Sequence, residues 1–445
     1  MPLAHPSRRA VLSGALAGGV LAALPAVPAQ AGAPDNSRSS VAQAVAFLDT
    51  MSNAYPASGT STLPQSYADE LGLFSTAFVY DAAVTVCAAL AAGRISLARR
   101  VGDGLLFAQD HDPHYHDGRL RQGYNVGPYV FYDGKPSPYG LVLPDGIANI
   151  GWQFGFLGTA VGDMAWPGIA LVRLYAATRD HRYLDGARRI ATWITSKAVN
   201  PGTLGGFRFG TTAADAPIAN VSTEHNIDCV AFFTMLDRVD RADWSGAADR
   251  ARAFVRKMWQ GQFFWTGSND GSTINRSPIP LDAQTWSWLA TLDERYLKAP
   301  LWAADNLWTT DEAGQPHSQL PKRTTLSGVT FSSASLTSTA AYNGITVNPH
   351  GVWCEGSAQL ACALQQRAGD RGSRTARSLL SDLTRAQQLL GRGQHVGGVS
   401  LGVGGLVAAT SLIDTGFGFG YFQVQHTGAT AWYVMAALRH NPLRL

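Results

Sequence analysis

The chain has 445 residues, of which 46% are hydrophobic and 15% are charged, so it can bury a large core and lacks the composition of a disordered chain. Its formal net charge of +3 gives no broad electrostatic reason to bind nucleic acid or an anionic membrane surface. The near-neutral charge also argues against a strongly acidic substrate. As a separate expectation, the mature protein is a monomer.

The N-terminus has the pattern of a secretory signal over residues 1–31. Paired arginines, Arg8 and Arg9, precede a mildly apolar stretch that ends in an Ala-Gln-Ala cleavage site. The alternative, a membrane anchor, is less favoured because two prolines interrupt the short apolar run. Cleavage removes both arginines and lowers the formal charge from +3 to +1. We expect secretion by a twin-arginine-type signal, a flexible linker over residues 32–40, and a single domain over residues 41–445.

Six alanine-rich segments share a small or polar opening followed by a helical apolar pattern. They begin near Tyr80, Ala165, Thr223, Asp282, Trp353 and Gly428. After four of them comes a more amphipathic helix, with arginine and aspartate on one face and aliphatic residues on the other. Alternation of buried and amphipathic helices at a long period predicts an all-α fold, a closed (α/α)6 toroid of six helical hairpins.

Polar and aromatic side chains lie at the openings of these six segments. In a toroid the inner helices are parallel, so their openings meet at one rim and line a shared cleft. The candidates at or just before the openings are Asp81, Trp166, Glu224, His225, Asn226, Asp228, Asp282, Gln284, Glu355 and His426. Their convergence is the functional signal in the sequence, and it depends on the fold prediction.

Several segments resemble those of one family. "STEHNID" at 222–228, "VWCEGSAQLACAL" at 352–364, "AWPGIALVRLYAATRDHRYLD" at 165–185 and "HTGATAWYVMA" at 426–436 resemble the six-hairpin (α/α)6-barrel glycosidases and their uncharacterised secreted relatives. The similarity extends over roughly residues 40–440. It implies the toroid fold and sugar chemistry. The exact activity stays open, because similar helix pairs occur in toroids that hydrolyse glycosides, cleave uronic acids or epimerise sugars.

Glycoside hydrolysis needs one carboxylic acid to protonate the leaving oxygen and a second carboxylate to act as base or nucleophile. Glu224 and Glu355 open two different helices and are the first candidates, with Asp228 and Asp81 as further catalytic candidates. Alternatively, Glu224 and Asp282 could serve only in capping their helices. Glu355 could likewise be a structural acid of the first helical turn.

Further residues are candidates for binding the sugar. Aromatic rings pack on the C–H faces of pyranoses, which favours Trp166, Trp286, Trp353 and Tyr421. Polar contacts are predicted for His225, Asn226, Asp282, Gln284 and His426. In the resembling proteins, the segment 110–125 matches a loop over the cleft, which implies substrate contact by Asp117, Arg119 and Tyr124. A second rim loop brings in Asp145.

Metal and cofactor chemistry are not favoured by the sequence. The segment 110–117 holds three histidines and three aspartates, but its spacing is not a known rigid ligand frame. The four cysteines fit no zinc pattern, and the Gly-rich segment 397–422 lacks a phosphate-binding motif. We therefore expect no metal and no cofactor, and an oligo- or polysaccharide as the partner.

The sequence leaves three functions open. The first is a secreted glycoside hydrolase that acts on a neutral or weakly charged glycan. The second is a polysaccharide lyase, for which Tyr124 or His116 would be the base and Arg119 would neutralise a uronate. The third is a toroid that binds glycans without catalysis.

Overall fold

A computed structural model of the chain describes residues 35–55, 61–71, 73, 75–130, 136–137, 140–150 and 157–445. The predicted signal over residues 1–31 lies outside the described residues. The first helix, α1 (Asp35–Ser52), begins inside the range predicted as a linker, so residues 35–40 are helical and that prediction was wrong for them. No helix of the described part of the chain has the length and apolar character to span a bilayer.

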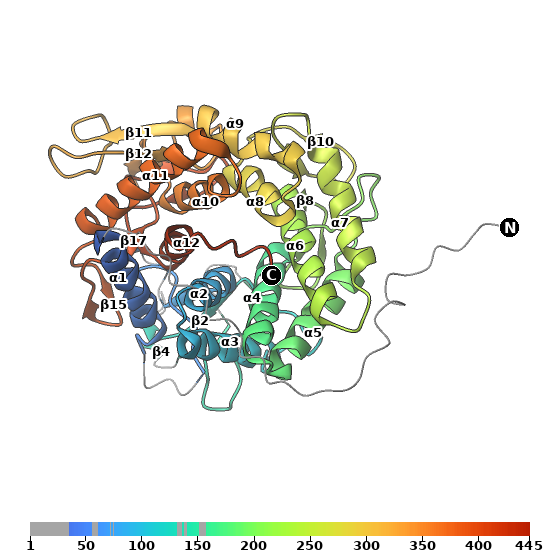
Figure 1. The fold of residues 1–445 in the computed structure, drawn as a ribbon. Coiled ribbons are helices and arrows are strands. Elements are labelled where there is room, and N and C mark those ends of the chain that lie inside the picture. Colours follow the sequence, from blue (N-terminus) through green and yellow to red (C-terminus); the bar gives the residue numbers. More distant parts are fainter. Residues whose placement is uncertain are drawn as a thin grey trace, which may run out of the picture.

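Six inner helices form a closed ring, as Figure 1 shows. They are α2 (Val79–Ala91), α4 (Val161–Thr178), α6 (Thr223–Val239), α8 (Leu281–Thr291), α10 (Cys354–Leu364) and α12 (Thr427–Ala437). Each packs against the next one, and α12 packs against α2, which closes the ring. These are the six segments that the sequence marked as inner helices, and the predicted (α/α)6 toroid is confirmed.

Six outer helices surround this ring. They are α1, α3 (Ile95–Asp110), α5 (His181–Lys197), α7 (Ser245–Met258), α9 (Lys298–Asn306) and α11 (Gly369–Leu389). Each of the last five packs on the inner helix that precedes it, whereas α1 packs on α12, so the two ends of the chain complete the sixth hairpin. The sequence predicted α3, α5, α7 and α11; it did not predict α1 or α9.

The burial patterns explain why the two sets of helices take different places. In α12 every residue from Thr427 to Ala436 is buried, so the helix has no solvent-facing side. In α11 the buried residues Gly372, Ala376, Leu379 and Leu383 follow a spacing of four and three, which is one stripe of a surface helix. Small residues also let inner helices approach closely: a Cβ on Gly168 of α4 would lie 2.5 Å from the Phe232 ring of α6.

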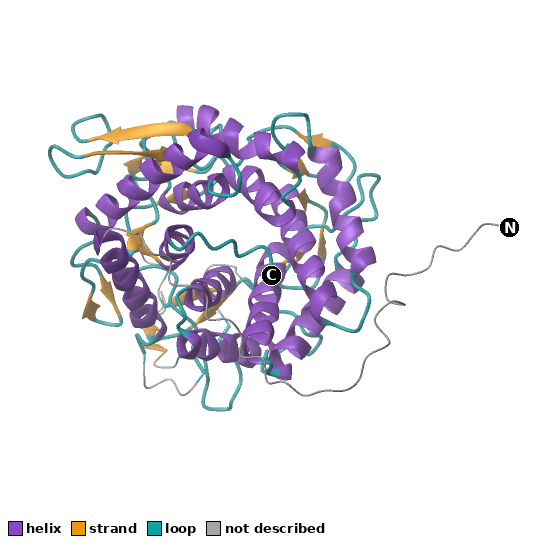
Figure 2. Cartoon of the chain, in the orientation of Figure 1, coloured by secondary structure: helices purple, strands orange, loops and turns teal. Residues whose placement is uncertain are grey.

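Short antiparallel strands join the helices (Figure 2). Their bounds are β1 (Thr76–Phe78), β2 (Gly123–Asn125), β3 (Tyr129–Val130), β4 (Pro136–Ser137), β5 (Thr159–Ala160), β6 (Gly210–Thr211), β7 (Pro217–Ile218), β8 (Val221–Ser222), β9 (Gly267–Ser268), β10 (Ile274–Asn275), β11 (Trp308–Glu312), β12 (Thr325–Val329), β13 (Ala341–Tyr342), β14 (Ile345–Thr346), β15 (His395–Val396), β16 (Val399–Ser400), β17 (Leu406–Val407), β18 (Ile413–Asp414), β19 (Gly420–Tyr421) and β20 (Gln425–His426).

Each inner helix begins directly after a residue that is paired as a strand. The strands β1, β5, β8 and β20 lead into α2, α4, α6 and α12, and single bridges at Pro280 and Trp353 precede α8 and α10. All six N-cap residues are in the extended conformation. The strand pairs therefore fix where each inner helix starts, and all six starts lie at one rim.

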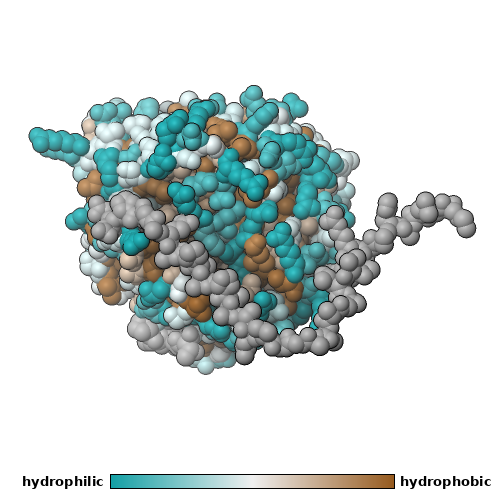
Figure 3. Space-filling model, in the orientation of Figure 1, coloured by the Kyte–Doolittle hydropathy of each residue, from teal (hydrophilic) through white to brown (hydrophobic). Residues whose placement is uncertain are grey.

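The C-terminal tail crosses the opposite end of the ring (Figure 1). The Arg173 guanidinium of α4 donates hydrogen bonds to the carbonyls of Pro442 and Arg444, at 3.3 and 2.6 Å. Asn441 donates from its amide to the Leu289 carbonyl near the end of α8. The tail thus covers the ring at the ends of the inner helices, away from the rim where they start. On the molecular face seen in Figure 3, hydrophilic and hydrophobic residues are interspersed.

Candidate active site

A cavity of about 870 Å³ lies at the rim where the inner helices begin. Five of the six inner helices place a carboxyl group on it from their first turn. These residues are Asp81, Asp163, Glu224, Asp282 and Glu355. The sixth helix, α12, contributes His426, its N-cap residue, whose Nδ1 lies 3.3 Å from the Ala429 amide nitrogen and accepts from it when the imidazole is neutral.

The helix starts explain this concentration of acids. The first turn of a helix leaves backbone N–H groups without intrahelical partners, and the aligned peptide dipoles favour negative charge there. A single first-turn acid therefore needs no functional explanation. Five of them in one buried cavity repel each other, which structural capping alone does not explain.

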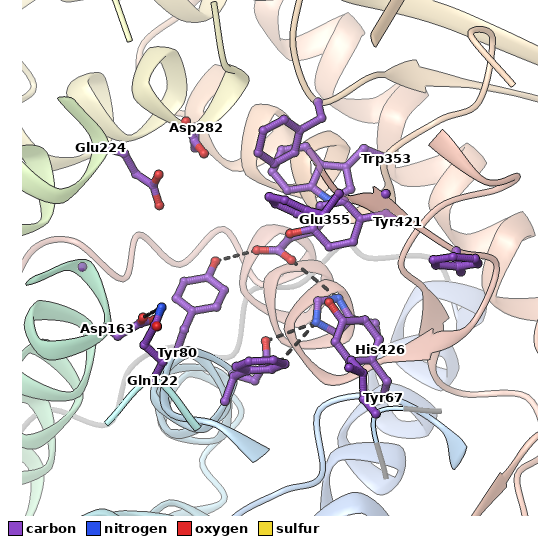
Figure 4. Close-up of a pocket in the computed structure, with 18 of the residues that line it drawn as sticks. Tyr67, Tyr80, Gln122, Asp163, Glu224, Asp282, Trp353, Glu355, Tyr421 and His426 are labelled. Carbon is purple, nitrogen blue, oxygen red and sulfur yellow. Dashed lines mark hydrogen bonds and ion pairs between the residues drawn. The ribbon is translucent and has the colours of Figure 1, made fainter. Parts of the chain in front are cut away.

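Glu355 accepts hydrogen bonds from two side chains and lies beside a third, His426 (Figure 4). The Tyr80 hydroxyl donates to its Oε1 at 2.5 Å, and the Gln359 amide donates to the same oxygen at 3.1 Å. Its Oε2 lies 3.6 Å from Nδ1 of His426. Burial raises the pKa of Glu355 to about 7, although the charge of His426 and the two donors oppose this rise. These donors favour its ionised form.

His426 joins Glu355 to Asp81. Its Nε2 lies 3.2 Å from Asp81 Oδ1, and the Tyr67 ring stacks on the imidazole with centroids 4.2 Å apart. Burial alone would lower the pKa of His426, but Asp81 and Glu355 outweigh it, and the pKa is raised. Gly428 makes room for this group, since a Cβ there would lie 2.4 Å from Asp81 Oδ1. The cation of His426 thus balances the two carboxylates beside it.

The opposite wall, built from α4, α6 and α8, holds acids without such a partner (Figure 4). Burial raises the pKa of Glu224 well above its usual range, and the nearby carboxyl groups of Asp282, Asp228 and Asp163 add to it. Burial also raises the pKa of Asp282, to about 6, although the Ala283 backbone N–H and, less strongly, the Glu224 carboxyl group oppose the rise. Asp163 has its pKa raised by burial to about 7, while the Gln122 amide donates to it at 3.1 Å. Among the carboxyl groups that line the cavity, Glu224 is therefore the one whose surroundings most favour the protonated form.

Ten of the predicted site residues line this cavity. They are Asp81, Trp166, Glu224, His225, Asp282, Trp286, Trp353, Glu355, Tyr421 and His426. Ser222 is the N-cap of α6 and accepts from the His225 amide, as the capping alternative expected, but Glu224 is the second helical residue and not the third, so it does not complete a capping box. The structure thus brings together residues that lie as far apart as 81 and 426 in the chain.

Asn226 and Gln284 are not among the lining residues, and both are committed to the backbone. The Asn226 amide bonds to the backbone N–H and carbonyl of Phe207 and to the Ser222 carbonyl. The Gln284 amide bonds in the same way to Phe264 and Pro280. Each lies two positions after a first-turn acid, about 200° away around the helix, and so faces away from the cavity. Predicting them as substrate-binding residues was wrong.

Gln284→Ala is expected to lower the free energy of unfolding by roughly 2–4 kcal/mol, because it leaves buried backbone groups without hydrogen bonds. Denaturant unfolding followed by circular dichroism measures this change. The exposed Gln260 supplies the matched control, since Gln260→Ala should stay within about 0.5 kcal/mol of the parent. A Gln284→Ala variant as stable as that control would contradict the anchoring role.

Asp228 lies below the lining of the cavity and is fully buried. It follows Glu224 by one helical turn, as the sequence indicated. Burial raises its pKa well above the usual range, and Asp282 and Asp163 raise it further, while the Trp166 indole opposes the rise. No hydrogen bond of normal geometry reaches either carboxyl oxygen from a described residue. Asp228 is thus a neighbour of the acids above it, without direct access to the cavity.

The predicted loop contacts also lie outside the lining of the cavity. Arg119 is paired with Asp117 and Asp215, both at 2.6 Å, so its charge is already used. Tyr124 is fully buried and its hydroxyl accepts from the Arg121 amide. Asp145 is exposed and accepts from the backbone N–H of Ile147 at 3.2 Å. These four side chains build and join loops, so their prediction as substrate contacts was wrong for this cavity.

A metal site does not form from the histidines and aspartates of segment 110–117. Asp112 pairs with Arg121 at 2.6 Å and accepts from two backbone amides. Within the described ranges, no group of three His, Cys, Asp or Glu side chains is arranged to hold a metal ion. The four cysteines are buried free thiols.

Asp163 is the main site residue that the sequence analysis missed. Helix α4 was predicted to begin near Ala165, but it begins at Val161, so Asp163 belongs to its first turn. The clear apolar pattern begins only at Ala165, so the start of the helix was placed too late. The other predicted inner helices with an acid carry it at their opening, and comparison with them would have indicated Asp163. Tyr67 and Gln122 were also missed, and Tyr80 was seen only as a helix start.

No known family model matches the sequence, and no curated protein matches it. Solved structures share its fold. An alpha-amylase from Clostridium perfringens has a TM-score of 0.56 at 11% identity, with 91% of this chain and 98% of that chain covered. A glycosidase variant in complex with glucose has a TM-score of 0.56 at 12% identity, with 93% and 100% covered. A cellobiose 2-epimerase from Bacillus thermoamylovorans has a TM-score of 0.53 at 11% identity, with 90% and 99% covered. At such identities the likeness shows the fold alone.

Proposed function

We propose that this protein is an exported glycoside hydrolase, in which Glu224 and Glu355 cleave a neutral or weakly charged glycan. The observation that carries the proposal is the pair of opposed walls of the cavity. One wall keeps Glu224 protonated, while donors on the other limit the rise that burial causes in the pKa of Glu355, which stays at about 7. Carboxyl groups whose surroundings push their proton affinities apart are typical of an acid and a base. The names of the solved structures, glycosidases and sugar epimerases, agree with a sugar substrate.

The proposed reaction uses each carboxyl group once. Glu224 gives its proton to the glycosidic oxygen as the bond from that oxygen to the anomeric carbon breaks. Glu355 takes a proton from a water molecule, whose oxygen forms the new bond to the anomeric carbon. The products are two shorter sugars, one of which has a new reducing end. Tyr80 and His426 hold Glu355 in place and favour its charge.

Aromatic rings give the cavity its sugar-binding walls. Trp353 and Tyr421 are stacked with centroids 5.7 Å apart, and the Phe331 ring lies 4.5 Å from Trp353. Trp166 and Trp286 meet edge to face at 5.1 Å on the other side. Flat apolar faces next to carboxylates suit a pyranose, which offers C–H faces and hydroxyl edges. The lyase alternative has no such residues in the cavity, because Arg119, its proposed partner for a uronate, and Tyr124, its proposed base, do not line it.

Incubation of the mature protein with a panel of glycans tests the proposal. New reducing ends without absorbance at about 235 nm would support hydrolysis, whereas that absorbance would indicate a lyase. Conversion of a sugar to its epimer without new reducing ends would contradict hydrolysis, and so would binding without turnover across the panel.

Tyr80→Phe is expected to lower kcat roughly tenfold and to move the acidic limb of the pH profile to higher pH. The hydroxyl donates to the Glu355 carboxylate, so its loss raises the pKa of that base above its present value of about 7. A base must be ionised to act, which fixes the sign of the change. Steady-state rates from pH 5 to 9 measure it, and an unchanged acidic limb would contradict the role of Tyr80.

A further inference from the structure

The wall of α4, α6 and α8 carries more carboxyl groups than the proposed hydrolysis uses. Asp163 and Asp282 line the cavity on either side of Glu224, and Asp228 lies beneath them. Within the described chain, none of these four carboxyl groups forms an ion pair with Arg, Lys or His. The α2, α10 and α12 side differs, because His426 lies between Asp81 and Glu355. The carboxyl groups of this half of the cavity therefore have no counterion among the described residues.

The wall of α4, α6 and α8 offers no cation of its own. The described residues around the cavity include no lysine and no arginine, and His225, the imidazole on this side, has its pKa lowered to about 4 by burial. It is therefore neutral at neutral pH. Burial and mutual repulsion together raise the proton affinities of Glu224 and Asp228. A positively charged ligand group would relieve that repulsion.

Three aromatic rings form a corner next to these acids. Trp166 follows Asp163 by three positions on α4, and Trp286 follows Asp282 by four positions on α8, so each indole lies on the same helix face as its acid. The Tyr80 ring meets Trp166 at 87° with centroids 5.4 Å apart, and Trp286 lies 6.1 Å from Tyr80. All three rings line the cavity. Aromatic faces set at angles to one another, with carboxylates beside them, bind ammonium groups.

We propose that the sugar bound in this cavity carries a free amino group, whose ammonium is held by Asp163 and Asp282 against Trp166, Trp286 and Tyr80. The substrate class is then a glycan that contains unacetylated hexosamine. This inference rests on the proposed glycosidase function and specifies its substrate. An N-acetyl group would remove the positive charge and leave both aspartates without a counterion. A uronate or a phosphate would be repelled by those carboxyl groups of the cavity that are ionised.

Binding and turnover are measured separately to test this inference. D-glucosamine and D-galactosamine are titrated at pH 6.5 against D-glucose, D-galactose and the two N-acetylated sugars, with tryptophan fluorescence as the readout. We expect at least tenfold tighter binding of the amino sugars, and weaker binding of them as salt rises. Equal or tighter binding of the neutral sugars would overturn the inference.

Two variants assign the preference to its residues. Asp163→Asn and Asp282→Asn should each reduce the preference for amino sugars at least tenfold and leave the affinity for D-glucose within about twofold. Asp145→Asn, which removes an exposed charge outside the cavity, should keep the full preference. Near-ultraviolet circular dichroism verifies that each variant is folded. Retention of the full preference in both Asp163→Asn and Asp282→Asn would overturn the assignment.

The outcomes for the two proposals are distinguishable. Hydrolysis of neutral oligosaccharides, with no preference for amino sugars in binding, would leave the glycosidase proposal standing and refute the ammonium site. Preferential binding of amino sugars without hydrolysis of hexosamine oligomers or of any other glycan would support the site and refute the glycosidase. Cleavage of glucosamine oligomers in preference to their N-acetylated and glucose counterparts supports both.

Discussion

Glu224→Gln and Glu355→Gln are each expected to lower kcat on the cleaved glycan by roughly 10²–10⁴-fold, because each removes a group that moves a proton in the transition state. Glutamine keeps the size and the shape of the side chain, so substrate affinity should change much less than kcat. The two variants should differ in pH dependence. Glu355→Gln should remove the acidic limb of the profile, and Glu224→Gln should remove the alkaline limb.

The exposed Glu294 provides a matched control for this pair. Glu294→Gln makes the same chemical change outside the cavity and should leave kcat and the pH profile unaltered. Rates are measured by reducing-end release at saturating glycan from pH 5 to 9. Full activity in either Glu224→Gln or Glu355→Gln would contradict the two-carboxylate reaction.

Asp228→Asn is expected to stabilise the protein at pH 8 by roughly 2–3 kcal/mol, the scale on which burial of an unpaired carboxyl group is unfavourable. Burial and the acids above it raise the pKa of Asp228 in the folded state, so the folded chain holds this proton more tightly than the unfolded chain. Such a group stabilises least at high pH, because stability is lost as pH rises from the usual aspartate range. The gain should shrink toward pH 5.

Thermal unfolding of both proteins at pH 5, 6.5 and 8 measures this difference. Asp163, Asp282 and Glu355 also have raised pKa values, of about 7, 6 and 7, so the parent protein should itself lose stability as pH rises from about 4 to about 7. Asp145→Asn serves as the control and should leave the pH dependence unaltered. An Asp228→Asn variant less stable than the parent at pH 8 would show that the carboxyl group has a partner in the folded state.

The fold could be predicted because composition and period act along the whole chain. Alanine-rich helices with no polar face, such as α12, can only be buried, and an amphipathic helix such as α11 can only cover them. Repetition of that pair leaves a ring as the arrangement that buries every inner helix. The short helix α9 and the first helix α1 escaped prediction, since nine residues of α9 make a weak pattern and α1 follows the presumed signal.

The site was predicted where a residue's place followed from its helix alone. Glu224, Asp282 and Glu355 lie in first turns, which the sequence marks clearly, and all three reach the cavity. Asn226 and Gln284 lie two residues further and point elsewhere, a distinction that depends on the exact first residue of each helix.

By itself, the sequence determined the all-α class, the six inner helices and the acids that open them. These depend on periodicity and on local preferences at helix starts, which a single chain shows directly. Only the tertiary structure decided which acids share a wall, which of them His426 balances and which are left without a cation. Those relations join residues from 58 positions apart, as for Glu224 and Asp282, to 345 positions apart, as for Asp81 and His426. The electrostatics of a carboxyl group depend on what lies within a few ångströms of it in space.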